Sequence, residues 1–265
     1  MSRTLGTTAW LDLNSTDLDT AKAFYAGLFG WTFEDGGEAL NHYAMVRNGD
    51  ALVGGAMDVS GMTCPDGDPL PSAWSVYLAV DDVDARVSAA REQGAQTVVE
   101  PDDAGRAGRF AVIVDSNNAG IGLWQAGEID GYDFTGQPGS PVWFENMTHG
   151  FERATEFYTI VFGANLVPML TPMAGDDFHY ATNGPEDEAT WGLCDATDVV
   201  PADATGWRIY FAVDSTDAAL ARVRELGGEV LDGPVDSPFG RIATVADPTG
   251  ATFQITALGE AEPEA

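Results

Sequence analysis

The segment that decides the fold is Asp17-Leu-Asp-Thr-Ala-Lys-Ala-Phe-Tyr-Ala-Gly-Leu-Phe-Gly-Trp31. Its apolar side chains recur every three or four residues, which is the period of a helix with one buried face. Ser15, Thr16 and Asp17 are residue types that cap a helix at its start, and Gly30 is of the type that ends one. The segment therefore predicts a helix that one of these three residues begins and Gly30 ends.

The same pattern returns 133 residues later, and the register holds across more than a hundred residues before a single deletion changes it to 132. The matched pairs include Trp10 with Trp143, Asp12 with Glu145, Phe24 with Phe157, Tyr25 with Tyr158, Trp74 with Trp207, Tyr77 with Tyr210, Asp84 with Asp217, and Arg109 with Arg241. Self-similarity at a fixed period is the mark of a duplicated structural unit. The chain is therefore predicted to contain two copies of one domain.

Within each copy, the order strand, helix, strands occurs twice. In the first copy we expect strands at residues 8–13, 42–47, 51–57, 74–80, 109–114 and 120–125, and a second helix at 81–93. A Gly- and Pro-rich stretch before residue 142 is typical of a linker. The predicted organisation is a first domain at 1–129, a linker at 130–141, a second domain at 142–258 and an acidic tail at 259–265.

Composition excludes several classes of partner. The 12 Lys and Arg against 42 Asp and Glu give a formal net charge of −30, and such a surface repels nucleic acid and anionic membranes. Two cysteines, Cys64 and Cys194, are too few for a disulfide scaffold and are typical of a reducing compartment. No stretch resembles a signal peptide or a membrane span. We therefore expect a soluble, cytoplasmic protein whose partner is a small molecule, as a monomer or a homodimer.

Four βαβββ units, the helix motif of residues 17–31 and a closing Asp247-Pro-Thr-Gly250 turn together resemble the vicinal oxygen chelate (VOC) superfamily. More narrowly, the chain is similar to tandem glyoxalase/bleomycin-resistance/dioxygenase-like proteins over residues 7–257. The resemblance implies an α+β fold in which four βαβββ units form two tandem VOC domains with cupped mixed β-sheets. It implies little about chemistry, because this superfamily hosts both metalloenzymes and metal-free binding proteins.

The resemblance also implies where metal ligands would lie. In the first domain the three aligned slots hold Trp10, Ser75 and Gly122, and the fourth falls near residues 55–57. In the second domain they hold Trp143, Arg208 and Gln254, and the fourth falls near residues 192–194. The superfamily's usual His and Glu ligands are missing from these positions. We therefore expect no cofactor and no divalent metal.

Two carboxylates are the candidate catalytic groups. Because side chains alternate along a strand, Asp12 shares a face with Trp10, and Glu145 shares one with Trp143. A carboxylate desolvated beside an indole has a raised pKa and can act as a general base. The alternative is that each carboxylate only accepts backbone hydrogen bonds or pairs with an arginine.

The remaining candidates are expected to contact a ligand. Arg208 either pairs with Glu145 or clamps a carboxylate or phosphate. His179, before a repeated Tyr-Ala, is either a strand-edge residue or a proton shuttle into the second cup. A flat aromatic molecule fits the composition of the predicted cups. The expected ligand-binding residues are Trp10, Ser75, Tyr77, Trp124, Trp143, Arg208, Tyr210 and Gln254.

Two functions from different classes remain. The first is metal-independent binding of a small organic molecule, expected to be aromatic. The second is a metal-independent enzyme, such as a lyase, isomerase or hydroxylase-like protein, with Asp12 or Glu145 as base. A metal-dependent glyoxalase I or extradiol dioxygenase is the least supported, because those reactions need the missing ligands. The stretch 105–109 is expected to be a turn rather than a phosphate site.

Overall fold

The computed structural model describes residues 3–64, 67–169, 179–185 and 187–258. The chain forms four modules, each with one strand, one helix and three further strands. The first two modules are β1 (Thr8–Ser15), α1 (Leu18–Phe29), β2 (Thr32–Asp35), β3 (Ala44–Asn48) and β4 (Ala51–Asp58), then β5 (Ala73–Ala79), α2 (Val83–Glu92), β6 (Gln96–Asp103), β7 (Gly108–Val114) and β8 (Gly120–Ala126). The other two are β9 (Pro141–Thr148), α3 (Phe151–Phe162), β10 (Val167–Pro168), β11 (Tyr180–Thr182) and β12 (Gly192–Asp195), then β13 (Gly206–Ala212), α4 (Thr216–Glu225), β14 (Glu229–Ser237), β15 (Gly240–Ala246) and β16 (Thr252–Ala257).

The strands form two mixed sheets that follow the two halves of the repeat. Their strand orders are β2-β3-β4-β1-β5-β8-β7-β6 and β10-β11-β12-β9-β13-β16-β15-β14. The first strand of each module pairs in parallel with the last strand of the same module, as β1 does with β4 and β5 with β8. The other pairings within the modules are antiparallel. The α+β class and the two tandem copies predicted from the sequence are confirmed.

The first helix has the predicted ends. The Asp17 side chain accepts a hydrogen bond from the Thr20 backbone N–H at 3.1 Å, which caps the helix. Gly30 ends it in the left-handed region with φ of 74°, where a side chain would be strained. Within the described ranges, no helix is long and apolar enough to cross a membrane.

Two of the strands, β2 and β6, follow only from the resemblance and not from the local pattern. Their side chains are mostly exposed or half-buried, because both strands lie at a sheet edge. An edge strand with a polar surface lacks the continuous apolar alternation that marks a buried strand.

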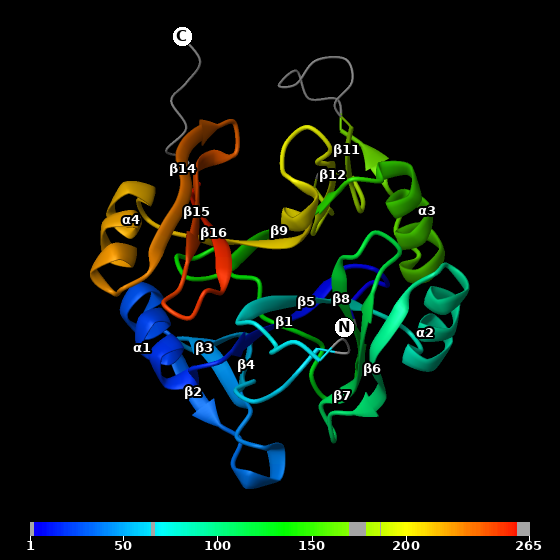
Figure 1. The fold of residues 1–265 in the computed structure, drawn as a ribbon, viewed down its shortest axis with the longest axis horizontal. Helices are drawn as coiled ribbons and strands as arrows, with labels where there is room; N and C mark the ends of the chain where they lie inside the picture. The colour runs from blue at the N-terminus through cyan, green and yellow to red at the C-terminus, as the bar shows by residue number, and fades with distance from the viewer. Residues whose placement is uncertain (1–2, 65–66, 170–178, 186, 259–265) are drawn as a thin grey trace. The chain divides into compact units, whose positions relative to one another are not determined.

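The chain packs into two compact units, and each unit combines segments that are distant in sequence. One unit comprises Met1–Trp10, Ser75–Gly131 and Phe144–Arg208, and in it α2 packs against α3 (Figure 1). The other comprises Leu11–Trp74, Tyr132–Trp143 and Ile209–Ala265, and in it α1 packs against α4. The domain boundaries expected from the repeat stay predictions, and the expected tail at 259–265 lies outside the described residues.

Each unit has a buried tyrosine at the centre of its core. In the first unit, the Tyr158 hydroxyl donates to the Asp115 carboxylate at 2.8 Å and accepts from Asn146 Nδ2 at 2.7 Å and Trp207 Nε1 at 3.1 Å. In the second, the equivalent Tyr25 hydroxyl accepts from the Trp74 indole at 2.9 Å. Burial is the largest cause that raises the pKa of both phenols well above 10. These tyrosines are therefore structural hydrogen-bonding groups.

Candidate functional site

The first-strand carboxylate of the first sheet is held by a phenol. Asp12 on β1 is 6% exposed, and the Tyr43 hydroxyl donates to its Oδ1 at 2.5 Å. Gly55 on β4 lies opposite Asp12 in the parallel ladder. A Cβ placed on Gly55 would lie 1.6 Å from the Tyr43 hydroxyl oxygen and 2.6 Å from Asp12 Oδ1. The Tyr43 ring therefore fills the space that a side chain at residue 55 would need.

The second sheet repeats this arrangement. Gly192 on β12 lies opposite Glu145 on β9, and a Cβ on Gly192 would lie 2.0 Å from the Tyr180 hydroxyl oxygen. In each domain, one glycine of the stretch expected to hold the fourth ligand slot, residues 55–57 or 192–194, is thus covered by a tyrosine ring. The sequence singled out neither tyrosine as a site residue, although the repeated Tyr-Ala was the signal that pointed to them.

The third aligned ligand position of the first domain is also a glycine that a tyrosine ring covers. Gly122 on β8 pairs with Tyr77 on β5, and a Cβ on Gly122 would lie 2.0 Å from Tyr77 Cδ1. In the second domain, Gln254 pairs with Tyr210 instead. Gln254 is 4% exposed, and its Oε1 has no hydrogen-bonding partner within the described part of the chain.

The tryptophans of the first domain stack on one another. The Trp10 and Trp124 rings lie 6.0 Å apart at 20°, and the Trp124 indole N–H donates to the Ile129 carbonyl at 3.0 Å. Both rings are nearly buried, at 4% and 6% exposed. Ser75 is half-buried. Their expected contact with a ligand stays a prediction.

Glu145, Cys194 and Arg208 form a charged group around a buried thiol. Cys194 on β12 is 4% exposed, and this burial is the main cause that raises its pKa to about 12. The Glu145 carboxylate raises the pKa further, and the Arg208 guanidinium lowers it. Glu145 and Arg208 are both half-buried. Among the residues that the structure describes, no ion pair joins them and Arg208 has no hydrogen-bond acceptor.

His179 lies at the edge of this region. Its side chain is 56% exposed, with Nδ1 3.6 Å from Asp195 Oδ2. Its ring stacks on Phe151 of α3 with centroids 5.5 Å apart, beside an open groove that also includes Glu152 and Ile160. Both interpretations of His179, as a strand-edge residue and as a proton shuttle, stay predictions.

The donor set does not fit the metal that the family resemblance implies. Across the described ranges, no three His, Cys, Asp or Glu side chains gather closely enough to hold a metal ion. The tyrosine rings on Gly55, Gly122 and Gly192 also leave no room for a carboxylate from those positions. We therefore derive no chemistry through a metal.

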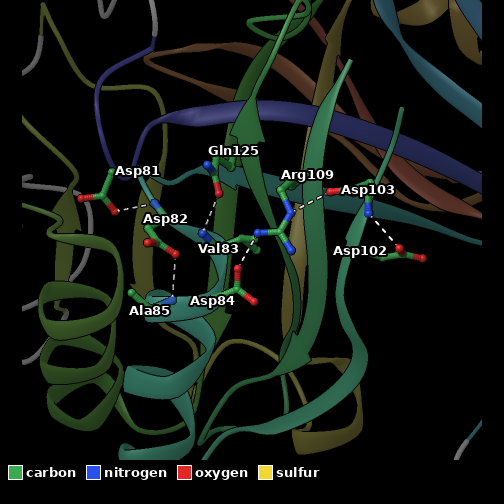
Figure 2. A network of polar contacts seen from close by, with 9 residues as sticks. All are labelled: Asp81, Asp82, Val83, Asp84, Ala85, Asp102, Asp103, Arg109 and Gln125. Carbon is green, nitrogen blue, oxygen red and sulfur yellow. Dashed lines mark hydrogen bonds and ion pairs between the residues drawn. The ribbon is translucent and has the colours of Figure 1, made fainter. Parts of the chain in front are cut away.

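The arginine of the 105–109 stretch is occupied by carboxylates. Figure 2 shows Arg109 on β7 between Asp84 of α2 and Asp103 of β6, with Nε donating to Asp103 at 2.8 Å. The equivalent Arg241 binds two aspartates in the same way. The structure thus gives this repeated arginine a role in joining strands, and the expected turn lies at residues 105–106.

Comparison with known proteins is consistent with this fold. The chain is 36% identical over 255 residues to "Putative glyoxylase CFP32" of Mycobacterium tuberculosis, which covers 94% of each chain. It is 33% identical over 280 residues to "Anthracycline biosynthesis protein DnrV" of Streptomyces peucetius, which covers 98% of this chain and 96% of that one.

Solved structures of low identity share the fold. The Mn(II)-bound glyoxalase from Novosphingobium aromaticivorans has a TM-score of 0.62 at 18% identity and covers 99% of this chain and 84% of its own. The 2,3-dioxygenase LapB from Pseudomonas sp. KL28 has a TM-score of 0.64 at 13% identity, and the match covers 100% of this chain and 98% of that one. The sequence profile of the Glyoxalase/Bleomycin resistance protein/Dioxygenase superfamily matches residues 7–123 and 142–255. The chain belongs to that superfamily.

Proposed function

We propose that this protein binds a small aromatic molecule on the second sheet, without the divalent metal of its metalloenzyme relatives. The observation that carries the proposal is a difference in exposure between equivalent residues. Trp10 and Tyr77 are buried, whereas their equivalents Trp143 and Tyr210, which belong to one compact unit, are half-buried. A half-buried aromatic side chain leaves part of its ring accessible, and a flat molecule can stack on it.

Metal independence is supported by the residues themselves. A catalytic metal site needs at least three protein ligands of the His, Cys or carboxylate type around an open coordination position. The three aligned slots of each domain hold indole, hydroxyl, guanidinium and amide groups and one glycine instead. Such groups bind organic molecules by stacking and hydrogen bonding.

The relatives' names also bear on the ligand class. One relative is named for anthracycline biosynthesis. Anthracyclines carry a planar ring system, which stacks well on indole and phenol side chains. This similarity supports an aromatic ligand for the present chain.

Calorimetric titration with a neutral hydroxyanthraquinone, with and without EDTA, tests the proposal. We expect the same affinity in both conditions. Trp143→Leu should weaken binding, whereas its repeat equivalent Trp10→Leu, checked by circular dichroism for folding, should leave the affinity unchanged. Loss of binding in EDTA, or a loss confined to Trp10→Leu, contradicts the proposal.

The second candidate function is metal-independent catalysis. The hydrogen bond from the Tyr43 hydroxyl to the Asp12 carboxylate favours it, because a phenol next to a carboxylate can pass on a proton. In that case Asp12→Asn or Glu145→Gln abolishes turnover of the bound molecule while binding persists. If binding is the whole function, these substitutions change the affinity alone.

A further inference from the structure

Arg208 differs from the other half-buried arginines of the chain. Arg47 pairs with Glu34 at 3.0 Å, and Arg86 and Arg241 each bind aspartate at 2.8 Å. In the part of the chain that the structure describes, Arg208 has neither an ion-pair nor a hydrogen-bond partner. Arg208 is half-buried, so its guanidinium stays accessible to an anionic partner from outside the chain.

The residues that bear on the Arg208 side chain, which are Glu145, Met147, Tyr180 and Cys194, belong to the same compact unit as Arg208. Arg208 sits on β13 between Trp207 and Ile209, and Ile209 is buried on the opposite face of the strand. In the second sheet, β9 lies between β13, which carries Arg208, and β12, which carries Cys194, and the Arg208 guanidinium lowers the pKa of the Cys194 thiol. Cys194 in turn packs with Met147, and Tyr180 lies against this apolar pair.

These neighbours define the chemistry of the partner. A planar guanidinium fork matches a carboxylate and binds it with two parallel hydrogen bonds. Glu145 acts on the same thiol from nearby, and its negative charge disfavours a dianion more than a monoanion. Tyr180, which is half-buried, offers a ring face beside the apolar pair.

We propose that Arg208 binds the carboxylate of an aromatic acid, with the organic part of the ligand against Tyr180. The inference rests on the proposed function and narrows its ligand from an aromatic molecule to an aromatic monocarboxylate. The equivalent position of the first sheet holds Ser75, which carries no charge. The anion site is therefore confined to the second sheet.

The test uses benzoate as the probe and the Arg208 Nε–H resonance in nitrogen-edited NMR spectra as the reporter. The Arg208→Gln variant lacks the Arg208 Nε–H resonance, which assigns that resonance in the wild-type spectrum. The same substitution removes the guanidinium that would bind the carboxylate. Arg224→Gln is the matched control, because Arg224 is an exposed arginine of α4 and its loss changes the net charge equally. Benzyl alcohol, acetate and inorganic phosphate complete the set of probes.

Benzoate should shift the Arg208 resonance and bind at least about tenfold more tightly to the wild type and to Arg224→Gln than to Arg208→Gln. Benzyl alcohol and phosphate should bind more weakly than benzoate. The inference is overturned if Arg208→Gln leaves benzoate affinity unchanged, if phosphate binds as tightly as benzoate, or if about 50 mM benzoate leaves the resonance in place.

The two proposals fail separately. If the hydroxyanthraquinone binds but benzoate does not engage Arg208, the carboxylate assignment is wrong and the aromatic site stands. If benzoate binds at Arg208 more tightly than acetate and the hydroxyanthraquinone does not bind, the carboxylate site stands and the proposed binding of a neutral aromatic molecule is wrong. If acetate binds Arg208 as tightly as benzoate, the ring contributes nothing and the inference of an aromatic acid is overturned.

Discussion

Replacement of Gly122 by alanine tests the packing of a tyrosine ring on a ligand-slot glycine. The new Cβ would lie 2.0 Å from Tyr77 Cδ1 and 2.4 Å from two further ring atoms. To restore an ordinary contact of 3.4 Å, the ring must move by roughly 1.4 Å. Tyr77 is only 7% exposed, so its surroundings must move as well. Overpacking of this kind costs about 1–3 kcal/mol.

Gly120 on the same strand is the matched control. A Cβ on Gly120 meets no heavy atom within 4 Å. Both substitutions share the gain of about 0.4–1 kcal/mol from a less flexible unfolded chain. In urea unfolding, Gly122→Ala should therefore be less stable than Gly120→Ala by about 1–3 kcal/mol.

The same two substitutions in a Tyr77→Ala variant show whether the Tyr77 ring causes the difference in stability. In Tyr77→Ala, the gap between the two alanine variants should fall to within about 0.5 kcal/mol, because no ring remains to be displaced. Equal stability of Gly122→Ala and Gly120→Ala in the wild-type background would refute the reasoning. So would a gap that survives unchanged in Tyr77→Ala.

Three further outcomes follow from the buried and charged groups. Tyr158→Phe should lower the free energy of unfolding by roughly 2–5 kcal/mol, since it removes the hydroxyl that binds the buried Asp115 and Asn146 and the half-buried Trp207. Urea denaturation that shows no loss would contradict this. At pH 8, Ellman's reagent should modify Cys64 and reach Cys194 only after denaturation, because the pKa of the Cys194 thiol is raised to about 12; two fast-reacting thiols would disprove it. Arg86 lowers the pKa of Asp81 from 3.8 to about 2, so this pair stabilises the fold above pH 3.8 and its contribution disappears as the pH falls towards 2. In an NMR titration, the titration midpoint of Asp81 should be higher in Arg86→Gln than in the wild type. An unchanged Asp81 midpoint would exclude the pairing.

The repeat and the local helix signals were sufficient to predict most of the fold. Caps and apolar periodicity are local, so α1 follows from Asp17, Gly30 and the residues between them. The edge strands β2 and β6 carry no such signal, because solvent rather than a core surrounds most of their side chains. The grouping of α2 with α3 also lay beyond the sequence, since it depends on packing between distant modules.

The site was partly predictable. The missing metal ligands could be identified because the repeat fixes Trp10 and Ser75 in register with Trp143 and Arg208. Which groups fill the remaining space could not, because Tyr43 and Tyr180 follow loops of different length and their rings reach glycines on a neighbouring strand. The sequence also could not show whether Arg208 forms an ion pair with Glu145, because an ion pair depends on distances between side chains in the folded sheet.

The most direct test of a metal-independent site is to measure, by plasma mass spectrometry, the metal content of protein purified without chelator. It is paired with thermal-shift titrations of manganese, nickel, zinc and iron(II), because an ion that binds the folded state raises its melting temperature. We expect substoichiometric metal and no saturable shift with any of the four ions. Near-stoichiometric metal, or a saturable shift with one ion that survives removal of surface-bound metal, would contradict the proposal of a metal-independent site.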